Sequence, residues 1–161
     1  MSSDPNLRIL KPSRKPLRPG DIFTLSPRAG TYLFGRLIAT DAAASAGLVG
    51  LTLIYIYAAE RSTPEPPDDH ELSPARLLVP PAMINRLPWS RGYFETIDRR
   101  DLRPEHRLAA HSFRDIRGRY FDEHATEIGG PIEPVGQQGV HSFRTIDDLV
   151  SDALGIPRAP D

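Results

Sequence analysis

Cysteine is absent from the 161-residue sequence. Its absence excludes a disulfide framework, a thiolate metal site and a thiol nucleophile, and it suits a reducing compartment. Net charge is also nearly absent, at −1 at pH 7, so the molecule as a whole has no strong attraction to nucleic acid or to a membrane surface. Neither cysteine chemistry nor overall charge therefore indicates a function.

Long hydrophobic stretches are scarce as well. The N-terminal residues lack the continuous apolar run and the small-residue cleavage site of a secretory signal. Residues 42–59 carry no charge, but their first half is Ala, Ser and Gly, and their second half is β-branched and aromatic, which is typical of a strand. We expect no membrane span and a cytoplasmic location.

Proline, by contrast, is abundant, with 17 residues. It predicts numerous stiff connections in a chain long enough for one domain with an apolar core. Charge is unevenly spread: residues 1–36 carry seven basic and two acidic groups, and residues 119–161 carry three basic and eight acidic groups. The two ends either pair with each other, form an acidic face, or are simply solvated.

Two segments near the start of the chain predict a β-hairpin. Residues 21–26 and 31–38 are strand candidates on either side of a turn at residues 27–30. In the first of them, Phe23 and Leu25 alternate with other residues, so we expect both side chains to point inward.

Further strands are predicted downstream. Residues 48–57 are apolar on both parities, which predicts a central strand covered on both faces. The aromatic-rich residues 89–97 predict another strand. Residues 111–113 and 119–122 predict a short hairpin around Gly118.

The C-terminal region predicts a helix. Thr145 is placed to cap it, and Gly155 followed by Pro157 is placed to end it. The apolar stripe that would face the core consists of Leu149, Val150, Ala153 and Leu154.

These segments predict a mainly β (β-rich α+β) fold: a twisted or barrel-like antiparallel sheet with a C-terminal helix and one or two short helical turns. One turn is predicted over residues 75–78, where Ser73 and Pro74 start it and Pro80 and Pro81 stop it. We divide the chain into a basic, proline-containing arm (1–19), a β-rich domain (20–128), and a loop plus helix packed on the same domain (129–161).

The histidines offer little for catalysis. No H-E-x-x-H pattern, G-x-S-x-G elbow or glycine-rich phosphate loop is present. The run Asp122-Glu123-His124 would supply metal ligands only if adjacent side chains faced one ion. His111 and His141 would form a nuclease-like pair only if the fold brought them together. We expect no enzyme activity, no metal and no cofactor, with a histidine-dependent hydrolase or nuclease as the weaker reading.

Nucleic-acid binding is an alternative that one segment favours. Residues 86–119 contain nine arginines with Tyr93 and Phe94 among them, and basic faces that carry aromatic side chains bind nucleic acid. Five acidic residues dilute this segment, and arginines on strands often pair with internal carboxylates instead. A nucleic-acid-binding β-barrel module is therefore the alternative, and a protein-binding module is the main expectation.

An ordered series of short motifs resembles the immunity 26 family of bacterial polymorphic toxin systems. The series spans about residues 11–128, and its best parts are the Gly-Asp pair at its start and the W-x-R-G-Y-F motif. The motifs are G-D-I-F (20–23), Y-x-F-G-R (32–36), L-T-L-I-Y-I-Y (51–57), L-L-V-P-P (77–81), W-x-R-G-Y-F-E-T-I (89–97), H-S-F (111–113) and Y-F-D-E (120–123).

The resemblance implies a mostly β fold without catalysis, and a protein that binds and neutralises a toxin made by the same cell or its kin. We interpret most residues at the motif positions as structural, with Arg36 and Arg91 either exposed beside a pocket or paired internally. These residues are Gly20, Asp21, Phe23, Gly35, Arg36, Trp89, Arg91, Gly92, Tyr93 and Phe94.

An acidic patch would complement such a partner, because toxin nuclease domains are commonly basic. Binding residues often lie on loops carried by a rigid scaffold, and acidic residues are concentrated in the proline-rich segment 60–72 and after residue 120. The predicted toxin-binding residues are Asp68, Asp69, Glu71, Asp122, Glu123 and Glu127.

Overall fold

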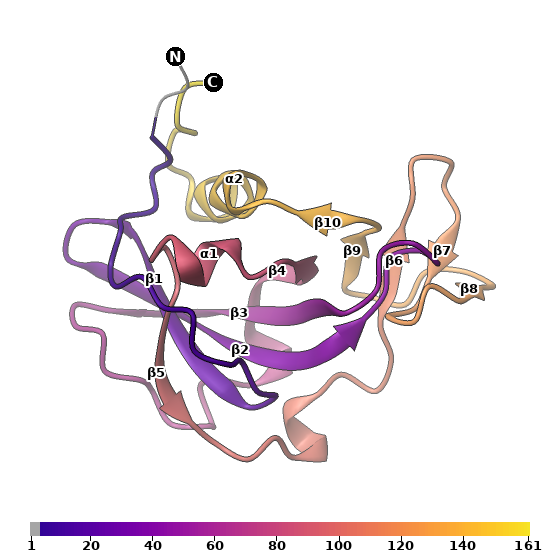
Figure 1. The fold of residues 1–161 in the computed structure, drawn as a ribbon, viewed down its shortest axis with the longest axis horizontal. Coiled ribbons are helices and arrows are strands. Elements are labelled where there is room, and N and C mark those ends of the chain that lie inside the picture. The colour runs from indigo at the N-terminus through magenta and orange to yellow at the C-terminus, as the bar shows by residue number, and fades with distance from the viewer. Residues whose placement is uncertain (1–3) are drawn as a thin grey trace.

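The fold is built on a six-stranded sheet, shown in a computed structural model that describes residues 4–161 (Figure 1). Its strand order is β10-β4-β3-β2-β1-β5, and all neighbours are antiparallel except β10 and β4. The strands are β1 (Asp21–Arg28), β2 (Thr31–Ala42), β3 (Leu51–Arg61), β4 (Leu77–Ile84), β5 (Glu95–Arg99) and β10 (Val140–His141).

A second, four-stranded sheet lies at one end of the molecule, on the right in Figure 1. Its order is β8-β7-β6-β9, with β6 parallel to β9 and the other pairs antiparallel. The strands are β6 (Ser112–Arg114), β7 (Tyr120–Phe121), β8 (Glu127–Ile128) and β9 (Val135–Gln137). The predicted mainly β fold class is confirmed. Both sheets are open, so of the two predicted forms the structure has the open sheet and not the barrel.

The large sheet is covered on both faces, as alternation along β2 requires. Leu33 and Leu37 belong to a core that also contains residues of the helices α1 (Leu87–Ser90) and α2 (Phe143–Leu154). Phe34 and Ile38 point the other way, into a second core that includes Phe113 of the small sheet. The continuous apolar sequence of β3 therefore has a buried environment on each side.

The N-terminal arm, residues 4–19, is extended along the domain. Leu7 is buried in the first core. The Asp147 carboxylate of α2 accepts the backbone N–H groups of Asn6 and Leu7, both at 2.9 Å, and the Leu10 N–H donates to the Gly92 carbonyl at 2.7 Å. Residues 1–3 of the predicted arm lie outside the described residues.

Most predicted elements of the N-terminal half are confirmed. Residues 21–26 and 31–38 lie in the β1–β2 hairpin, and β3 is buried over most of its length, although it begins at Leu51 rather than at residue 48. The predicted helical turn is the 3-10 turn η1 (Pro74–Arg76), where the Ser73 hydroxyl accepts the Ala75 N–H. A second turn, η2, spans Pro104–His106.

Two predictions between residues 77 and 97 are wrong. Pro80 and Pro81 do not stop a segment but lie inside β4, where the register with β3 shifts between Ile54 and Ile56; such irregularities accommodate proline within a sheet. Trp89 and Ser90, predicted to begin a strand, lie in α1 instead, because Pro88 suits the start of a helix, and the strand β5 begins only at Glu95.

The C-terminal segment differs from the prediction in three details. The helix is confirmed, but Ser142 rather than Thr145 caps α2, its hydroxyl accepting the Thr145 N–H, and Gly155 ends it. Ala153 is exposed, and Phe143, Ile146 and Val150 are the buried apolar residues of α2. Residues 129–139 are not entirely loop, because β9 pairs with β6 and adds a strand to the small sheet.

Replacing Gly35 with alanine should destabilise the fold by about 1–3 kcal/mol, as expected for an overpacked core. A Cβ atom at Gly35 would lie 2.2 Å from a Phe23 ring carbon and 2.6 Å from the Tyr55 carbonyl oxygen, which belongs to the neighbouring strand. Urea unfolding followed by Trp89 fluorescence measures the loss. Gly129→Ala is the matched control because a Cβ there meets nothing within 4 Å. Equal stabilities of the two variants would contradict the packing argument.

Candidate functional site

Asp69, one of the predicted toxin-binding residues, is bound by two arginines of this chain. Its Oδ1 atom accepts from Arg36 Nη2 at 2.7 Å and from Arg100 Nη1 at 2.9 Å. His106 Nε2 lies 3.5 Å from the other carboxylate oxygen. Arg36 comes from the middle of β2 and its side chain is fully buried, whereas 46% of the Asp69 side chain is exposed. Asp69 therefore supplies the counter-charge for a buried guanidinium.

We call Arg36, Asp69, Arg100 and His106 the Arg36 network. Its electrostatics follow from the distances between these side chains. Burial alone would raise the pKa of Asp69, but the hydrogen bond from Arg100 and the positive charges around it hold the pKa below its ordinary value. Arg36 Nε and Nη1 are buried without a hydrogen-bond partner, as is the hydroxyl of Tyr57. Burial raises the pKa of Tyr57, with Arg36 acting in the opposite sense. Asp69 is thus the ion-pair partner of a guanidinium that is otherwise unsatisfied.

Neighbouring acidic residues of the same loop also have partners within the chain. The Asp68 carboxylate accepts the backbone N–H of His70 at 3.0 Å, which fixes the local turn. Glu71 pairs with Arg61 at the end of β3. The structure brings Asp68, Asp69 and Glu71 together on one loop, and their role in toxin binding stays a prediction.

The second predicted acidic group includes a residue that contacts a buried histidine. Glu123 Oε2 lies 3.4 Å from His111 Nδ1, and His111 Nε2 lies 2.6 Å from the Tyr55 hydroxyl of β3. The Tyr55 oxygen also accepts the Leu108 N–H at 3.0 Å. If Tyr55 donates its proton to Nε2, the Nδ1 atom carries the imidazole proton and faces the Glu123 carboxylate.

Burial has the largest effect on the pKa values of Tyr55 and His111 in this series of contacts. It lowers the pKa of His111 against the opposing effect of Glu123 and raises the pKa of Tyr55 to about 12. Both side chains are almost inaccessible, with Tyr55 at 0% and His111 at 3% exposure. The chain of contacts joins the large sheet to the segment beyond β7, and the sequence had singled out His111 without its partner Tyr55.

The remaining two acidic candidates differ from each other. The Asp122 carboxylate accepts the N–H groups of His124 at 2.9 Å and of Thr126 at 3.0 Å, which closes the turn between β7 and β8. Glu127 is exposed in β8. Of the six predicted residues, Glu127 is the one whose side chain makes no hydrogen bond or ion pair with the described residues.

Several residues at the motif positions form one aromatic cluster. Phe23 stacks on Phe94 with ring centroids 4.5 Å apart, and Trp89 meets both rings edge-on. Gly35 lies directly opposite the Phe23 ring. All of these residues lie in the first core or against it.

The other motif positions hold chain segments together. Gly20, with a φ of +96°, is buried against Arg100, and Asp21 accepts the Arg18 N–H at 3.0 Å, while its burial raises its pKa. Gly92 contacts the N-terminal arm, as described above. Tyr93 stacks on Phe143 of α2 at 4.8 Å, and the Arg91 guanidinium lies 5.4 Å from the same ring. Arg36 is thus internally paired, and Arg91 is exposed beside an aromatic ring.

The histidines do not form a shared centre. His111 precedes β6 of the small sheet and His141 lies in β10 of the large one, and no described hydrogen bond joins them. His70 and His106 line one hollow of about 340 Å³ together with Asp69, but His106 Nδ1 accepts the Arg103 N–H at 3.0 Å and Asp69 is held by arginines. No group of three or more potential ligands among residues 4–161 is arranged to hold a metal ion.

The structure also bears on the nucleic-acid and membrane alternatives. Tyr93 and Phe94 are 7% and 0% exposed, so neither ring can stack on a base in the way that the arginine-rich segment 86–119 had suggested. Within the described chain, none of the helices has the length and apolar character needed to cross a membrane, and most of the uncharged segment 42–59 lies in β3 and the loop before it.

Lowering the pH from 7 to 5 should reduce the stability of the fold through His111. Its folded-state pKa is lowered, so its stabilising contribution is complete above the unfolded pKa of about 6.5 and is lost as the pH falls below that value, by up to about 2 kcal/mol at pH 5. Burial lowers the pKa values of His106 and His141 in the same sense, whereas the raised pKa values of Asp21 and Asp147 act in the opposite sense.

Urea unfolding at both pH values, on the wild type and on His111→Asn, isolates this contribution because the other groups are common to both proteins. The variant should lose less stability than the wild type between pH 7 and pH 5. His70→Asn, at an exposed position, serves as the control. An identical pH dependence in wild type and His111→Asn would show that His111 does not remain neutral in the folded state.

Comparisons with known proteins gave one match. The comparisons with curated proteins and with solved structures found no match. The family model described as immunity protein 26 matches residues 18–121, which runs from the residues before β1 to the end of β7 and includes the Arg36 network, the aromatic cluster, Tyr55 and His111. On the extent of this match, the chain belongs to the immunity protein 26 family.

Proposed function

We propose that this protein is an immunity protein that acts in the bacterial cytoplasm, where it binds and neutralises a cognate toxin domain by protein–protein contact without catalysis. The observation that carries the proposal is the family match over residues 18–121. A protein family of this kind implies a toxin as partner.

The internal architecture supports a binding role. The groups best suited to acid–base chemistry, His106 and His111, are buried and have partners within the chain. Those contacts fix loops onto a sheet that is covered on both faces. A rigid scaffold of this kind loses little conformational entropy when a partner docks on its outer surface, which favours tight association.

Co-expression should protect cells from the toxin. The matching toxin is sought as the C-terminal domain of a large secreted protein encoded beside this gene. Cells expressing that domain alone should stop growing, and cells expressing both proteins should grow at the rate of uninduced cells. A complex of the two purified proteins, measured by isothermal titration calorimetry, is the direct readout. Growth arrest despite co-expression, with no complex detected, would contradict the proposed function.

The acidic residues of the loop are proposed to steer the toxin towards the complex. Neutralising Asp68, Asp69 and Glu71 together should slow association, most visibly at low salt, because steering between opposite charges is screened by ions. Stopped-flow association rates at two salt concentrations measure the effect. Glu65→Gln, at an exposed acidic residue in the same loop, is the control. Thermal melts show whether the triple variant, which loses the ion pairs of Asp69 and Glu71, is still folded at the temperature of the measurement. An unaltered rate constant in the triple variant would assign these carboxylates to the fold alone.

A further inference from the structure

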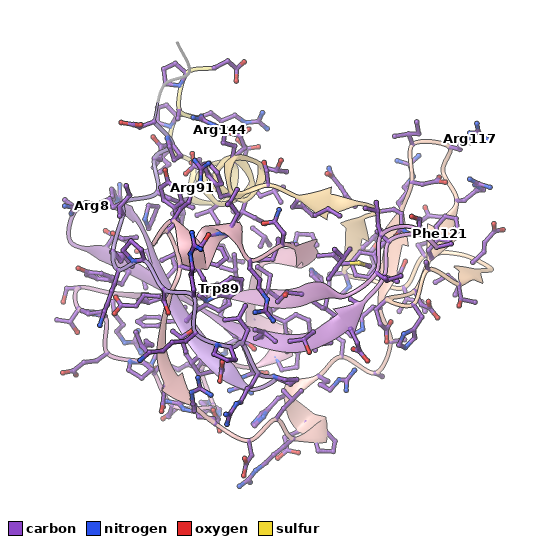
Figure 2. The ribbon with its side chains drawn as sticks, in the orientation of Figure 1. Arg8, Trp89, Arg91, Arg117, Phe121 and Arg144 are labelled. Carbon is purple, nitrogen blue, oxygen red and sulfur yellow. The ribbon has the colours of Figure 1, made fainter. Side chains whose placement is uncertain are left out.

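A completely exposed isoleucine lies at the tip of the β6–β7 hairpin. Ile116 has a relative exposure of 102%, the highest among the exposed large hydrophobic residues of the described chain. Figure 2 shows its neighbour Arg117 at the outer end of this hairpin, beyond the body of the molecule. Removing an apolar side chain from water lowers the free energy, so an isoleucine exposed in this position is available to be buried by a partner.

Hydrogen bonds to Asp115 close the turn that carries Ile116. The Asp115 carboxylate accepts the N–H groups of Arg117 at 2.9 Å and of Arg119 at 2.8 Å, and it also accepts from Arg119 Nε at 3.0 Å. The Asp115 N–H donates to the Arg119 carbonyl at 2.9 Å. Desolvation acts to raise the pKa of Asp115, but hydrogen bonds from the backbone and side chain of Arg119 and from the backbone of Arg117 hold it below its ordinary value. Because the turn is already closed before a partner binds, little further conformational entropy of the hairpin is lost when Ile116 docks.

Other exposed apolar residues are concentrated at the same end of the molecule. Hydrogen bonds join its segments: Gln138 donates its backbone N–H to the Arg114 carbonyl and its side-chain amide to the Ala44 carbonyl. We call this region the small-sheet end: the β6–β7 hairpin, the β2–β3 loop (43–50), the β8–β9 loop (129–134) and the start of β10. It carries five of the seven exposed large hydrophobic residues, namely Leu48, Val49, Ile116, Ile132 and Val140.

The β6–β7 hairpin that carries Ile116 has three arginines and one aspartate between its residues 114 and 119. Arg114 and Arg117 are exposed and make no ion pair with the described residues. Arg119 pairs with Asp115 and lies 5.5 Å from the centre of the Phe121 ring. A hollow of about 430 Å³ beside the tip is lined by Ile116, Val135 and Gln137, among others. The surface thus combines one projecting apolar side chain, free guanidinium groups and a recess.

We infer that the small-sheet end is the surface that anchors the toxin, with Ile116 inserted into an apolar recess of the toxin that is rimmed by carboxylates. This inference rests on the proposed function and names the contact surface for it. Carboxylates are assigned to the rim of the recess because Arg114 and Arg117 lie beside Ile116 and make no ion pair with the described residues. An anchor that becomes buried in the complex controls how slowly the complex dissociates.

Replacing Ile116 with aspartate tests the anchor. The variant should raise the Kd for the toxin domain encoded beside this gene by about 30-fold or more, as for an interface hot spot, mainly through faster dissociation. Arg117→Glu should raise the Kd by about 10-fold, as expected for loss of a charge pair at the rim. Both side chains are exposed, so thermal melts of the two variants should match the wild type.

Ile9→Asp is the matched control. Ile9 is 64% exposed but lies on the N-terminal arm, next to Arg8, which Figure 2 shows at the opposite end of the molecule from Arg117. It should leave the Kd within twofold of the wild type. If the wild type binds the toxin domain and Ile116→Asp binds equally well, the anchor assignment is wrong while the proposed function stands. If the wild type itself does not bind, the proposed function fails and the anchor assignment fails with it.

Discussion

Burial of β2 and β3 on both faces is the constraint on which the rest of this structure depends. A sheet whose central strands are apolar on both sides cannot leave either face in water. The two faces are covered by different parts of the chain: α1, α2 and the N-terminal arm on one side, and the loops and small sheet on the other. Segments distant in sequence are therefore required to make one sheet stable.

Polar groups on the second face then determine where several charged residues go. Arg36 and Tyr55 face this layer, between Phe34 and Ile38 on β2 and between Leu53 and Tyr57 on β3. A buried charge without a counter-charge is strongly unfavourable, and a buried hydroxyl needs a hydrogen-bond partner. Asp69 meets the first need and His111, with Glu123 behind it, meets the second. Acidic residues that look available for a partner in the sequence are thus partly committed to the fold.

How far the sequence predicted the structure varies with the range of the interactions involved. The β1–β2 hairpin, the Ser73 turn and the end of α2 at Gly155 follow from local turn and cap chemistry, and all were predicted. Two assignments were wrong. Pro80 and Pro81 lie within β4, where pairing with β3 imposes strand geometry, and Trp89 packs on Phe23 from a helical turn rather than from a strand. Of the small-sheet end, the sequence predicted the short hairpin but not the exposure of Ile116 at its tip.

The sequence by itself determined that the chain is mainly β, that β3 is covered on both faces, and that its motifs match those of one family of immunity proteins. These properties depend on alternation, turn residues and motif order, which can be read along the chain. Only the tertiary structure decided which carboxylate meets Arg36, that Tyr55 and His111 touch, and that exposed apolar residues from four segments collect at one end. Such pairings depend on which loops the two buried faces bring together, and no local pattern in the chain encodes that choice.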